Sequence, residues 1–223
     1  MTQCVLLSAG RGERLRPLTD VTPKPLVEVG GETLIGRHLA MLKASGAQRV
    51  IVNLGWLGEH IAEYVGDGRR WGVNVIYSAE GFPTLDTGGA IAKAIALLND
   101  APFWVINADI WTDFMLPSIE SVLPQGVDGA IGLVDNPRYR ASGDFSLQDG
   151  LAKNDTDAAL TFSGIACYHP RFFRHQEIER FSVVPLLREA AEQNKLGGFK
   201  IVEAWFDSGT HERLAELRAY ANS

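Results

Sequence analysis

The most constraining feature of the sequence is a strand-length apolar run followed by a loop rich in glycine, arginine and proline. Residues 5–9 have the length and composition of a buried strand. Prolines at positions 17, 23 and 25 remove backbone donors and fix local torsions, so we expect a long ordered loop rather than a helix. Gly10 and Gly12 let backbone N–H groups approach a bulky anion. The stretch predicts a polyphosphate site, with positive charge from Arg11, Arg14, Arg16 and Lys24.

Two familiar glycine loops do not match this stretch. The dinucleotide fingerprint G-x-G-x-x-G opens a helix, whereas here Arg16 and Pro17 follow in a loop and the third glycine is missing. The P-loop pattern ends in Gly-Lys-Ser/Thr, which this stretch lacks. Neither of these phosphate-binding loops is therefore predicted.

Composition narrows the class of protein further. With 223 residues, 46% of them hydrophobic, the chain can bury the core of a single domain. The net charge of −6 gives no electrostatic reason to expect nucleic acid, and no apolar stretch is long enough to span a bilayer. No secretory signal precedes the first strand, and Cys4 and Cys167 lie in apolar stretches that predict buried free thiols. We expect a cytoplasmic protein without membrane or nucleic-acid partners.

Apolar strand-like runs alternate with helical patterns along the chain, which predicts an α/β fold with a parallel sheet covered by helices on both faces. We expect one domain, residues 1–223, built as a Rossmann-like three-layer sandwich with a mostly parallel sheet. The polar stretch 136–159 predicts hairpins or a loop over a site. The expected strands are 49–53, 73–77, 102–107, 129–133, 162–168 and 199–202, and the expected helices are 34–44, 57–65, 90–98, 119–123, 183–192 and 212–220.

Two aspartates are candidates for a metal site. Asp109 directly follows a buried strand, and ligands of open parallel sheets bind at the carboxyl ends of strands. Asp207 follows the apolar pair Trp205-Phe206 and precedes Ser-Gly-Thr. Two carboxylates from separate strand ends suit one Mg²⁺ whose remaining ligands are water and phosphate oxygens. Each aspartate taken singly is equally typical of a helix N-cap or a turn.

Six segments together resemble the sugar-1-phosphate nucleotidyltransferases, which join a sugar 1-phosphate to a nucleoside triphosphate. The resemblance covers essentially the whole chain. One departure is Ala108, where the family commonly has glycine, and another is the missing acidic-basic pair before a proline, for which Lys153 is a weak substitute. The segments are the N-terminal loop, Leu-Asp-Thr-Gly-Gly at 85–89, Asn-Ala-Asp at 107–109, Gly-Asp-Phe at 143–145, Phe-Ser-Gly-Ile at 162–165 and Trp-Phe-Asp-Ser-Gly-Thr at 205–210.

The resemblance implies a role for each matching residue. It implies a nucleotide-binding half at about residues 1–110 and a sugar-binding half at about 111–223. Arg16 and Lys24 would be catalytic, because they would neutralise the leaving pyrophosphate, and Asp109 and Asp207 would hold Mg²⁺. The nucleotide would contact Leu7, Ala9, Gly10, Gly12, Lys24, Glu80, Gly88 and Asn107, and the sugar would contact Gly143, Asp144, Phe162, Ser163 and Gly164.

The substrates are less constrained than the reaction. Glu80 could accept the N3–H of uracil or the N1–H and N2–H of guanine, and chemistry alone slightly favours guanine. The chain's length and its Tyr-Ser-x-Glu-Gly stretch resemble a short group of uridylyltransferases of bacterial cell-wall recycling, which favours UTP, then GTP, and N-acetylmuramate 1-phosphate as the sugar. Mannose 1-phosphate with GTP, or another hexose 1-phosphate, is the alternative. A catalytically silent regulatory subunit and a glycosyltransferase are weaker alternatives, and the expected assembly is a monomer or small homo-oligomer.

Overall fold

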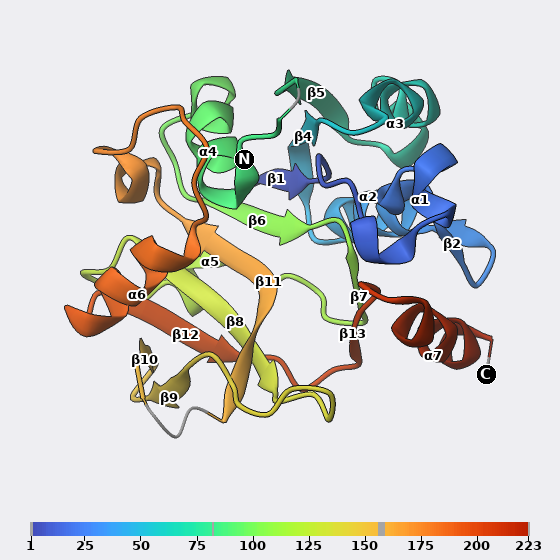
Figure 1. The fold of residues 1–223 in the computed structure, drawn as a ribbon. Helices are drawn as coiled ribbons and strands as arrows, with labels where there is room; N and C mark the ends of the chain where they lie inside the picture. Colours follow the sequence, from blue (N-terminus) through green and yellow to red (C-terminus); the bar gives the residue numbers. More distant parts are fainter. Residues whose placement is uncertain (1, 82, 156–158, 223) are drawn as a thin grey trace.

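The central sheet is formed by strands from both halves of the chain. The computed structural model describes residues 2–81, 83–155 and 159–222. The strands of the central sheet are β1 (Thr2–Leu7), β4 (Ala47–Leu54), β5 (Asn74–Ala79), β6 (Phe103–Asn107), β8 (Gly129–Asp135), β9 (Ser146–Gln148), β10 (Leu151–Lys153), β11 (Leu160–Tyr168) and β12 (Leu196–Lys200). Within the described residues they form a nine-stranded sheet in the order β5-β4-β1-β6-β11-β8-β12-β10-β9 (Figure 1).

Strand direction divides this sheet into two parts. β5, β4, β1 and β6 run parallel to one another, whereas β11 is antiparallel to both of its neighbours, β6 and β8. Because the four parallel strands point the same way, their carboxyl ends meet at one edge of the sheet. The loops that leave those ends can therefore build a common site.

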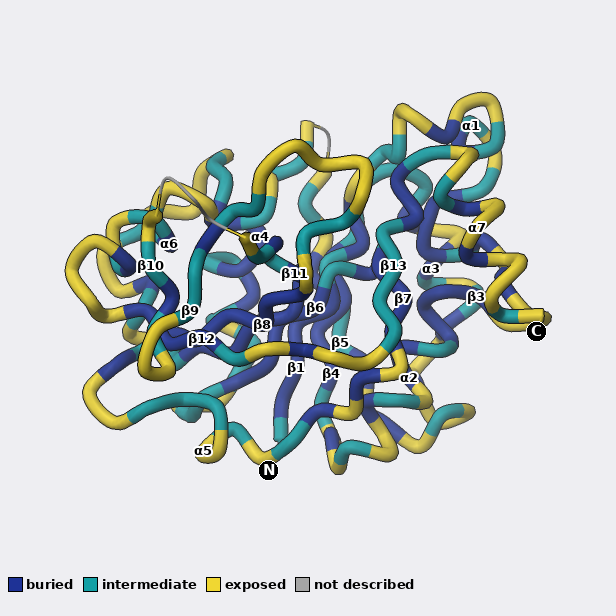
Figure 2. Tube along the Cα trace, turned by 90° about the horizontal axis from the view of Figure 1, so that it is seen from below, coloured by how far each residue is buried: buried dark blue, intermediate teal, exposed yellow. Residues whose placement is uncertain are grey.

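Helices cover both faces of the sheet, because its strands present apolar side chains on both sides. On one face, α2 (Leu34–Ala44) and α3 (Gly58–Val65) bury Leu39, Leu42 and Ile61 in the core. On the other face, α4 (Asp86–Ala94) and α6 (Val184–Glu192) bury Ile91 and Leu187. Figure 2 accordingly shows buried central strands and exposed chain at the periphery.

The C-terminal segment returns to the N-terminal loop. β13 (Trp205–Asp207) pairs antiparallel with β7 (Ile110–Thr112), and the register sets Asp207 opposite Ile110. The following α7 (His211–Ala221) packs Leu214 and Leu217 into a third apolar cluster that also contains Leu15 of the N-terminal loop. That loop contains α1 (Leu18–Val21), and the short hairpin of β2 (Glu28–Val29) and β3 (Glu32–Thr33) follows it. Residues far apart in sequence thus meet around one end of the sheet.

The structure confirms the α/β fold and the three layers, and it corrects several details. The helix expected at 90–98 begins at Asp86, and the strand expected at 199–202 overlaps only the end of β12, which spans Leu196–Lys200. The ladder of β7 and β13 had no period-2 signal in the sequence, because each strand has three residues. α5 (Ile119–Val122) lies where a helix was expected. Cys4 and Cys167 are buried free thiols, as predicted. No helix in the described part of the chain is long and apolar enough to cross a membrane.

Candidate active site

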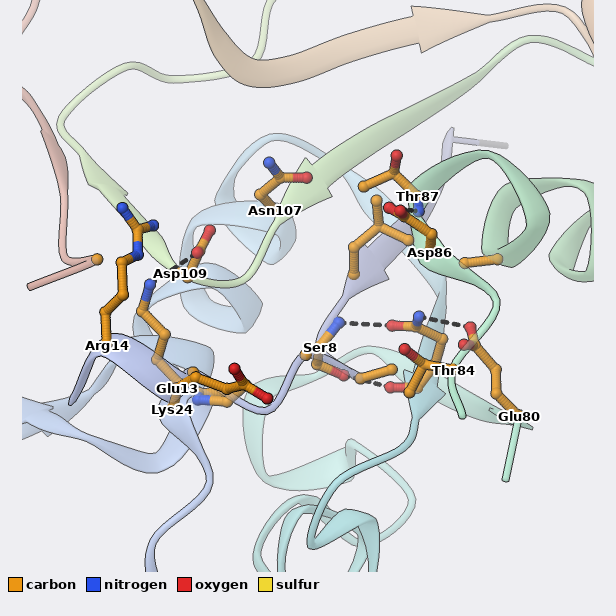
Figure 3. A pocket seen from close by; sticks show the side chains of 18 of the residues that line it. Ser8, Glu13, Arg14, Lys24, Glu80, Thr84, Asp86, Thr87, Asn107 and Asp109 are labelled. Atoms are coloured by element: carbon orange, nitrogen blue, oxygen red, sulfur yellow. Dashed lines mark hydrogen bonds and ion pairs between the residues drawn. The ribbon is translucent and has the colours of Figure 1, made fainter. Parts of the chain in front are cut away.

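A cavity of about 480 Å³ opens at the carboxyl ends of the parallel strands (Figure 3). β1, β4 and β6 deliver Leu7, Asn53 and Asn107 to it, as expected of an open parallel sheet. The start of the N-terminal loop and the first turn of α4 complete its wall. Among the described residues, the charged side chains that line it are the acids Glu13, Glu80, Asp86 and Asp109 and the cations Arg14, Lys24 and Arg180.

Lys24 and Asp109 form an ion pair inside this cavity. The Lys24 ammonium donates to Asp109 Oδ2 at 2.7 Å, and the lysine is only 6% exposed. Burial acts to raise the pKa of the Asp109 carboxyl, but the charge of Lys24 and its hydrogen bond outweigh that effect and hold the pKa below its ordinary value. Lys24, which the sequence assigns to the nucleotide phosphates, therefore lines this cavity.

A hydrogen-bonded chain connects the first strand to the opposite wall of the cavity. The backbone N–H of Ser8 donates to Asn53 Oδ1 at 2.5 Å, and Asn53 Nδ2 donates to Glu80 Oε1 at 2.7 Å. The N–H of Leu85 donates to Glu80 Oε2 at 2.8 Å. Glu80, predicted to read the base, is therefore held in place by two donors. Figure 3 shows Ser8 and Glu80 at the two ends of the chain that runs through Asn53.

Gly88 and Gly89 bring a remote loop onto the first turn of α4. Both N–H groups donate to the carbonyl oxygen of Phe181, at 2.9 and 3.2 Å. A Cβ at Gly88 would lie 2.2 Å from the Phe181 ring, and one at Gly89 would lie 1.9 Å from the Glu179 carbonyl oxygen. Any side chain at either position would push this loop away. The close contact keeps Arg180 at the cavity.

Asp207 lies beside the first cavity and lines a second one of about 810 Å³. Its Oδ1 accepts from the N–H of Gly209 at 2.6 Å, and its Oδ2 accepts from Arg213 at 2.5 Å. Gly209 itself lines the first cavity, so the two cavities meet at this turn. The second cavity is lined by aromatic residues Tyr139, Trp205 and Phe206, by Arg138 and Arg213, and by the acids Asp135, Glu203, Asp207 and Glu216, among others.

The donor set fits a hard divalent cation that keeps several substrate or water ligands. Asp109 presents a carboxylate that is 43% accessible, with one oxygen on Lys24. Asp207 is held against the same segment, because the N–H and hydroxyl of Ser208 donate to the Asp109 carbonyl oxygen at 3.2 and 2.7 Å. Within the described residues, no cluster of three His, Cys, Asp or Glu side chains forms a closed metal site. Mg²⁺ bound by two carboxylates and phosphate oxygens needs no such cluster.

The predicted nucleotide residues fall into two groups. Leu7, Ala9, Gly10, Gly12, Lys24, Glu80 and Asn107 line the first cavity together with Asp109. Arg16 and Gly88 are absent from its described lining. Arg16 is exposed and donates to Asp20 at 2.8 Å, and Gly88 faces Phe181. Their contacts with the nucleotide stay predictions.

The predicted sugar residues lie near one another on β11 and the loop before β9, yet they line neither cavity among the described residues. Asp144 Oδ2 accepts from the Phe162 N–H at 2.9 Å and from Arg140 at 2.6 Å. The Ser163 hydroxyl donates to the Gly132 carbonyl oxygen at 2.8 Å. Gly143 precedes Asp144, and Gly164 packs against Asn107, which lines the first cavity. The Lys153 ammonium donates to Asn194 Oδ1, and Lys153 lines neither cavity among the described residues.

The fold brings Asn53 and Arg180 to the site, and neither was predicted from the sequence. Asn53 was simply the end of an expected strand, whereas Arg14 was predicted as one of the loop cations and lines the cavity. Arg180 lies in a stretch without helical or strand periodicity. The signal for Arg180 was indirect, because the pair Gly88-Gly89 indicates a close approach to α4.

A cavity at the carboxyl ends of parallel strands, walled by a glycine-arginine loop, is typical of nucleotide-binding α/β proteins. The family model "Nucleotidyl transferase" matches residues 3–125. The chain is 42% identical to N-acetylmuramate alpha-1-phosphate uridylyltransferase of Neisseria meningitidis, and the match covers 99% of both chains. The protein belongs to the nucleotidyl transferase family.

Other relatives support the same family and fold. The chain is 29% identical to a protein of that name from Caulobacter vibrioides, with 97% of this chain and 95% of the relative covered. It is 30% identical to mannose-1-phosphate guanylyltransferase catalytic subunit beta of Drosophila pseudoobscura, with 93% of this chain covered but only 59% of the relative. HddC from Yersinia pseudotuberculosis, solved with GMP-PN, superposes with a TM-score of 0.79 at 24% identity over 99% of both chains.

Proposed function

We propose that this protein transfers a uridylyl group from UTP to N-acetylmuramate 1-phosphate, giving UDP-N-acetylmuramate and pyrophosphate. The uridylyltransferase of Neisseria meningitidis, similar over its whole length, supports both substrates. GTP with a hexose 1-phosphate is the second candidate, which the guanylyltransferase relatives favour. We expect the activity in the cytoplasm, because nucleoside triphosphates are made there.

The observation that carries the proposal is the charge of the first cavity. Arg14 and Arg180 line it, and within the described residues neither guanidinium has an ion-pair or hydrogen-bond partner. Unpartnered cations around a cavity suit a polyphosphate. The four acids and three cations of the lining cannot neutralise a triphosphate by themselves. This balance supports a divalent cation, and we assign Mg²⁺ to Asp109 and Asp207.

The proposed mechanism is an in-line displacement. An oxygen of the sugar phosphate attacks the α-phosphorus of UTP, the bond from that phosphorus to the bridging oxygen breaks, and pyrophosphate leaves with both bonding electrons. The protein positions the reactants and neutralises charge, so no protein nucleophile is needed. Lys24 and Arg16 stabilise the phosphates, and Arg180 contacts the sugar phosphate. When bound, Mg²⁺ supplies charge neutralisation at the α-phosphate.

We further infer that the second cavity receives the sugar. It adjoins the first cavity at Asp207 and Gly209, which suits a substrate whose phosphate lies at the metal. Tyr139, Trp205 and Phe206 offer apolar surfaces to the sugar. Asp144 and Phe162 line neither cavity among the described residues, so their effect on the sugar would be indirect. In this proposal the nucleotide is bound mainly by residues up to about 110, with Arg180 and Gly209 added from the later part, and the sugar by residues after 110.

One assay tests the proposal. Pyrophosphate release is measured with UTP, GTP, CTP, ATP and dTTP against N-acetylmuramate, N-acetylglucosamine, glucose and mannose 1-phosphates, with and without Mg²⁺. We expect the highest kcat/KM for UTP with N-acetylmuramate 1-phosphate, and no turnover after chelation of divalent cations. Highest activity with GTP and mannose 1-phosphate would favour the second candidate, and no pyrophosphate from any pair would refute transferase activity.

A further inference from the structure

Asn53 is a buried polar residue between the phosphate loop and the base-reading side of the first cavity. It lies near the end of β4, is 3% exposed, and uses both ends of its amide. Its Oδ1 accepts from the Ser8 N–H at 2.5 Å, and its Nδ2 donates to Glu80 Oε1 at 2.7 Å. Its backbone carbonyl oxygen also accepts from the Ser8 hydroxyl. Asn53 therefore joins three segments of the chain.

The polarity of this chain of hydrogen bonds follows from the backbone. The Ser8 N–H can only donate, so the oxygen of the Asn53 amide faces Ser8 and the NH₂ group faces Glu80. The second Glu80 oxygen faces another obligatory donor, the Leu85 N–H, at 2.8 Å. Each Glu80 oxygen thus faces an N–H group that can only donate. Glu80 is therefore fixed as a group that only accepts hydrogen bonds.

We propose that Asn53 is a positioning residue that fixes Glu80 as an acceptor and thereby makes the site select uracil over cytosine. The inference rests on the proposed function and on the role that the sequence assigns to Glu80, contact with the base. Uracil and cytosine have the same size, so a pocket distinguishes them by hydrogen bonds. Uracil carries a donor at N3, whereas cytosine carries a lone pair there. A fixed acceptor attracts the first and repels the second in the same pose.

The same geometry predicts what single substitutions do. Asn53→Asp sets a carboxylate against Glu80. Glu80→Gln introduces an NH₂ group that must face either Asn53 Nδ2 or the Leu85 N–H, and both are donors. Asn53→Asp therefore sets two carboxylates against each other, and Glu80→Gln sets two N–H donors against each other, in a confined place. We expect each to lower Tm by about 2–8 °C.

The double variant Asn53→Asp with Glu80→Gln reverses the polarity of the bond and restores its complementarity. The carboxylate introduced at position 53 would still accept from the Ser8 N–H and would now also accept from the NH₂ group introduced at position 80. The amide oxygen at position 80 would accept from the Leu85 N–H. We expect Tm to return to within about 2 °C of wild type. The remaining amide hydrogen would face the base as a donor, so the ratio of kcat/KM for UTP to that for CTP should fall by about 10-fold or more.

Gln3 provides a matched control at the other end of β1. It is also a buried amide, 0% exposed, and its Oε1 accepts from the Asn99 N–H at 2.8 Å. Gln3→Ala should lower Tm by a similar amount and leave the UTP to CTP ratio unchanged. A change of that ratio is therefore not a general result of losing a buried amide.

The experiment measures Tm and the UTP to CTP ratio in wild type, both single variants, the double variant and Gln3→Ala. Recovery of Tm in the double variant together with a lowered ratio supports the proposal. Failure of Tm to recover overturns the coupling of Asn53 to Glu80, and recovery of both Tm and the ratio overturns base selection. The Tm measurements need no turnover, so an inactive wild type would refute the proposed function separately.

Discussion

The two halves of the molecule use their polar side chains differently. In the half up to residue 110, Lys24, Glu80 and Asp109 face one cavity, and each is held there by a hydrogen bond or ion pair. In the later half, Asp144 accepts from the Phe162 N–H of β11 and Ser163 donates to the Gly132 carbonyl oxygen of β8, so both are committed to backbone groups of neighbouring strands. The cavity beside that half is lined by other residues, including Tyr139 and Phe206.

The wall of the first cavity that follows β1 comes from one short stretch of sequence, whereas the second cavity is assembled from distant segments. One loop after β1 supplies glycine, arginine and lysine within a short stretch. The second cavity instead combines residues from the end of β8, from β13 and from α7. A motif can describe the first arrangement, but the second depends on how the chain closes on itself.

The largest expected effect follows from removing the buried ammonium group of the first half. Lys24→Met should lower kcat by about 10²–10³-fold, because one charge-stabilising group at a reacting phosphate contributes that much. It should also raise the pKa of the Asp109 carboxyl, since the nearby positive charge that lowers it is lost. Steady-state kinetics with saturating UTP measures the first effect. Lys43→Met, in the last turn of α2, should remain fully active. A folded Lys24→Met variant with normal kcat would show that its charge has no catalytic role.

The next effect concerns the free energy of unfolding at acidic pH, to which His38 of the first half contributes. Burial lowers the pKa of His38 to about 4, and its ring nitrogen Nε2 lies 2.9 Å from the Ile110 carbonyl oxygen, to which the neutral ring donates. Below pH 6.5 the unfolded chain binds a proton at this histidine that the folded chain does not. Stability should therefore fall between about pH 6.5 and pH 4 by about 3 kcal/mol and be unaffected by this group above that range.

Urea unfolding across that pH range, in wild type and in His38→Gln, measures the contribution. The glutamine can still donate to the Ile110 carbonyl oxygen, but it does not titrate. Its curve should lack the loss assigned to His38, whereas His60→Gln, on the exposed side of α3, should keep it. Parallel curves for wild type and His38→Gln would contradict this account.

The smallest effect is expected in the second half. Asp144→Asn weakens the bonds to the Phe162 N–H and to Arg140, so the free energy of unfolding should fall by about 1–2 kcal/mol. The KM for the sugar 1-phosphate should rise only a few-fold, because Asp144 lines neither cavity in the described part of the chain. A rise in KM of about 100-fold without loss of stability would instead assign Asp144 a direct contact with the sugar.

The sequence predicted the parts of the site that lie in one segment or at the end of a strong strand. The loop after β1, Asn107 and Asp109 are such parts, and all of them contribute to the cavity. The burial of Lys24 against Asp109 was not predicted, because this ion pair joins residues 85 positions apart in the sequence. Arg180 could not be predicted, because its position depends on a loop that packs against two glycines of α4.

Two further features of the fold, the ladder of β7 with β13 and the direction of β11, left no local signal in the sequence. β7 and β13 each have three residues, which is too few for an alternating pattern, yet their pairing holds Asp207 near Asp109. The direction of β11, antiparallel to both neighbours, left no sign in its composition because it is buried like the parallel strands. Tertiary contacts rather than local preference decide such features.

The most direct experiment tests whether the first cavity selects the nucleotide and the second cavity selects the sugar, independently of each other. We would measure two kcat/KM ratios, UTP to GTP and N-acetylmuramate 1-phosphate to N-acetylglucosamine 1-phosphate. The variants are Glu80→Gln in the first cavity and Tyr139→Leu in the second. We expect Glu80→Gln to change only the nucleotide ratio and Tyr139→Leu to change only the sugar ratio, each by about 5-fold or more. Equal shifts of both ratios in either variant would contradict this expectation.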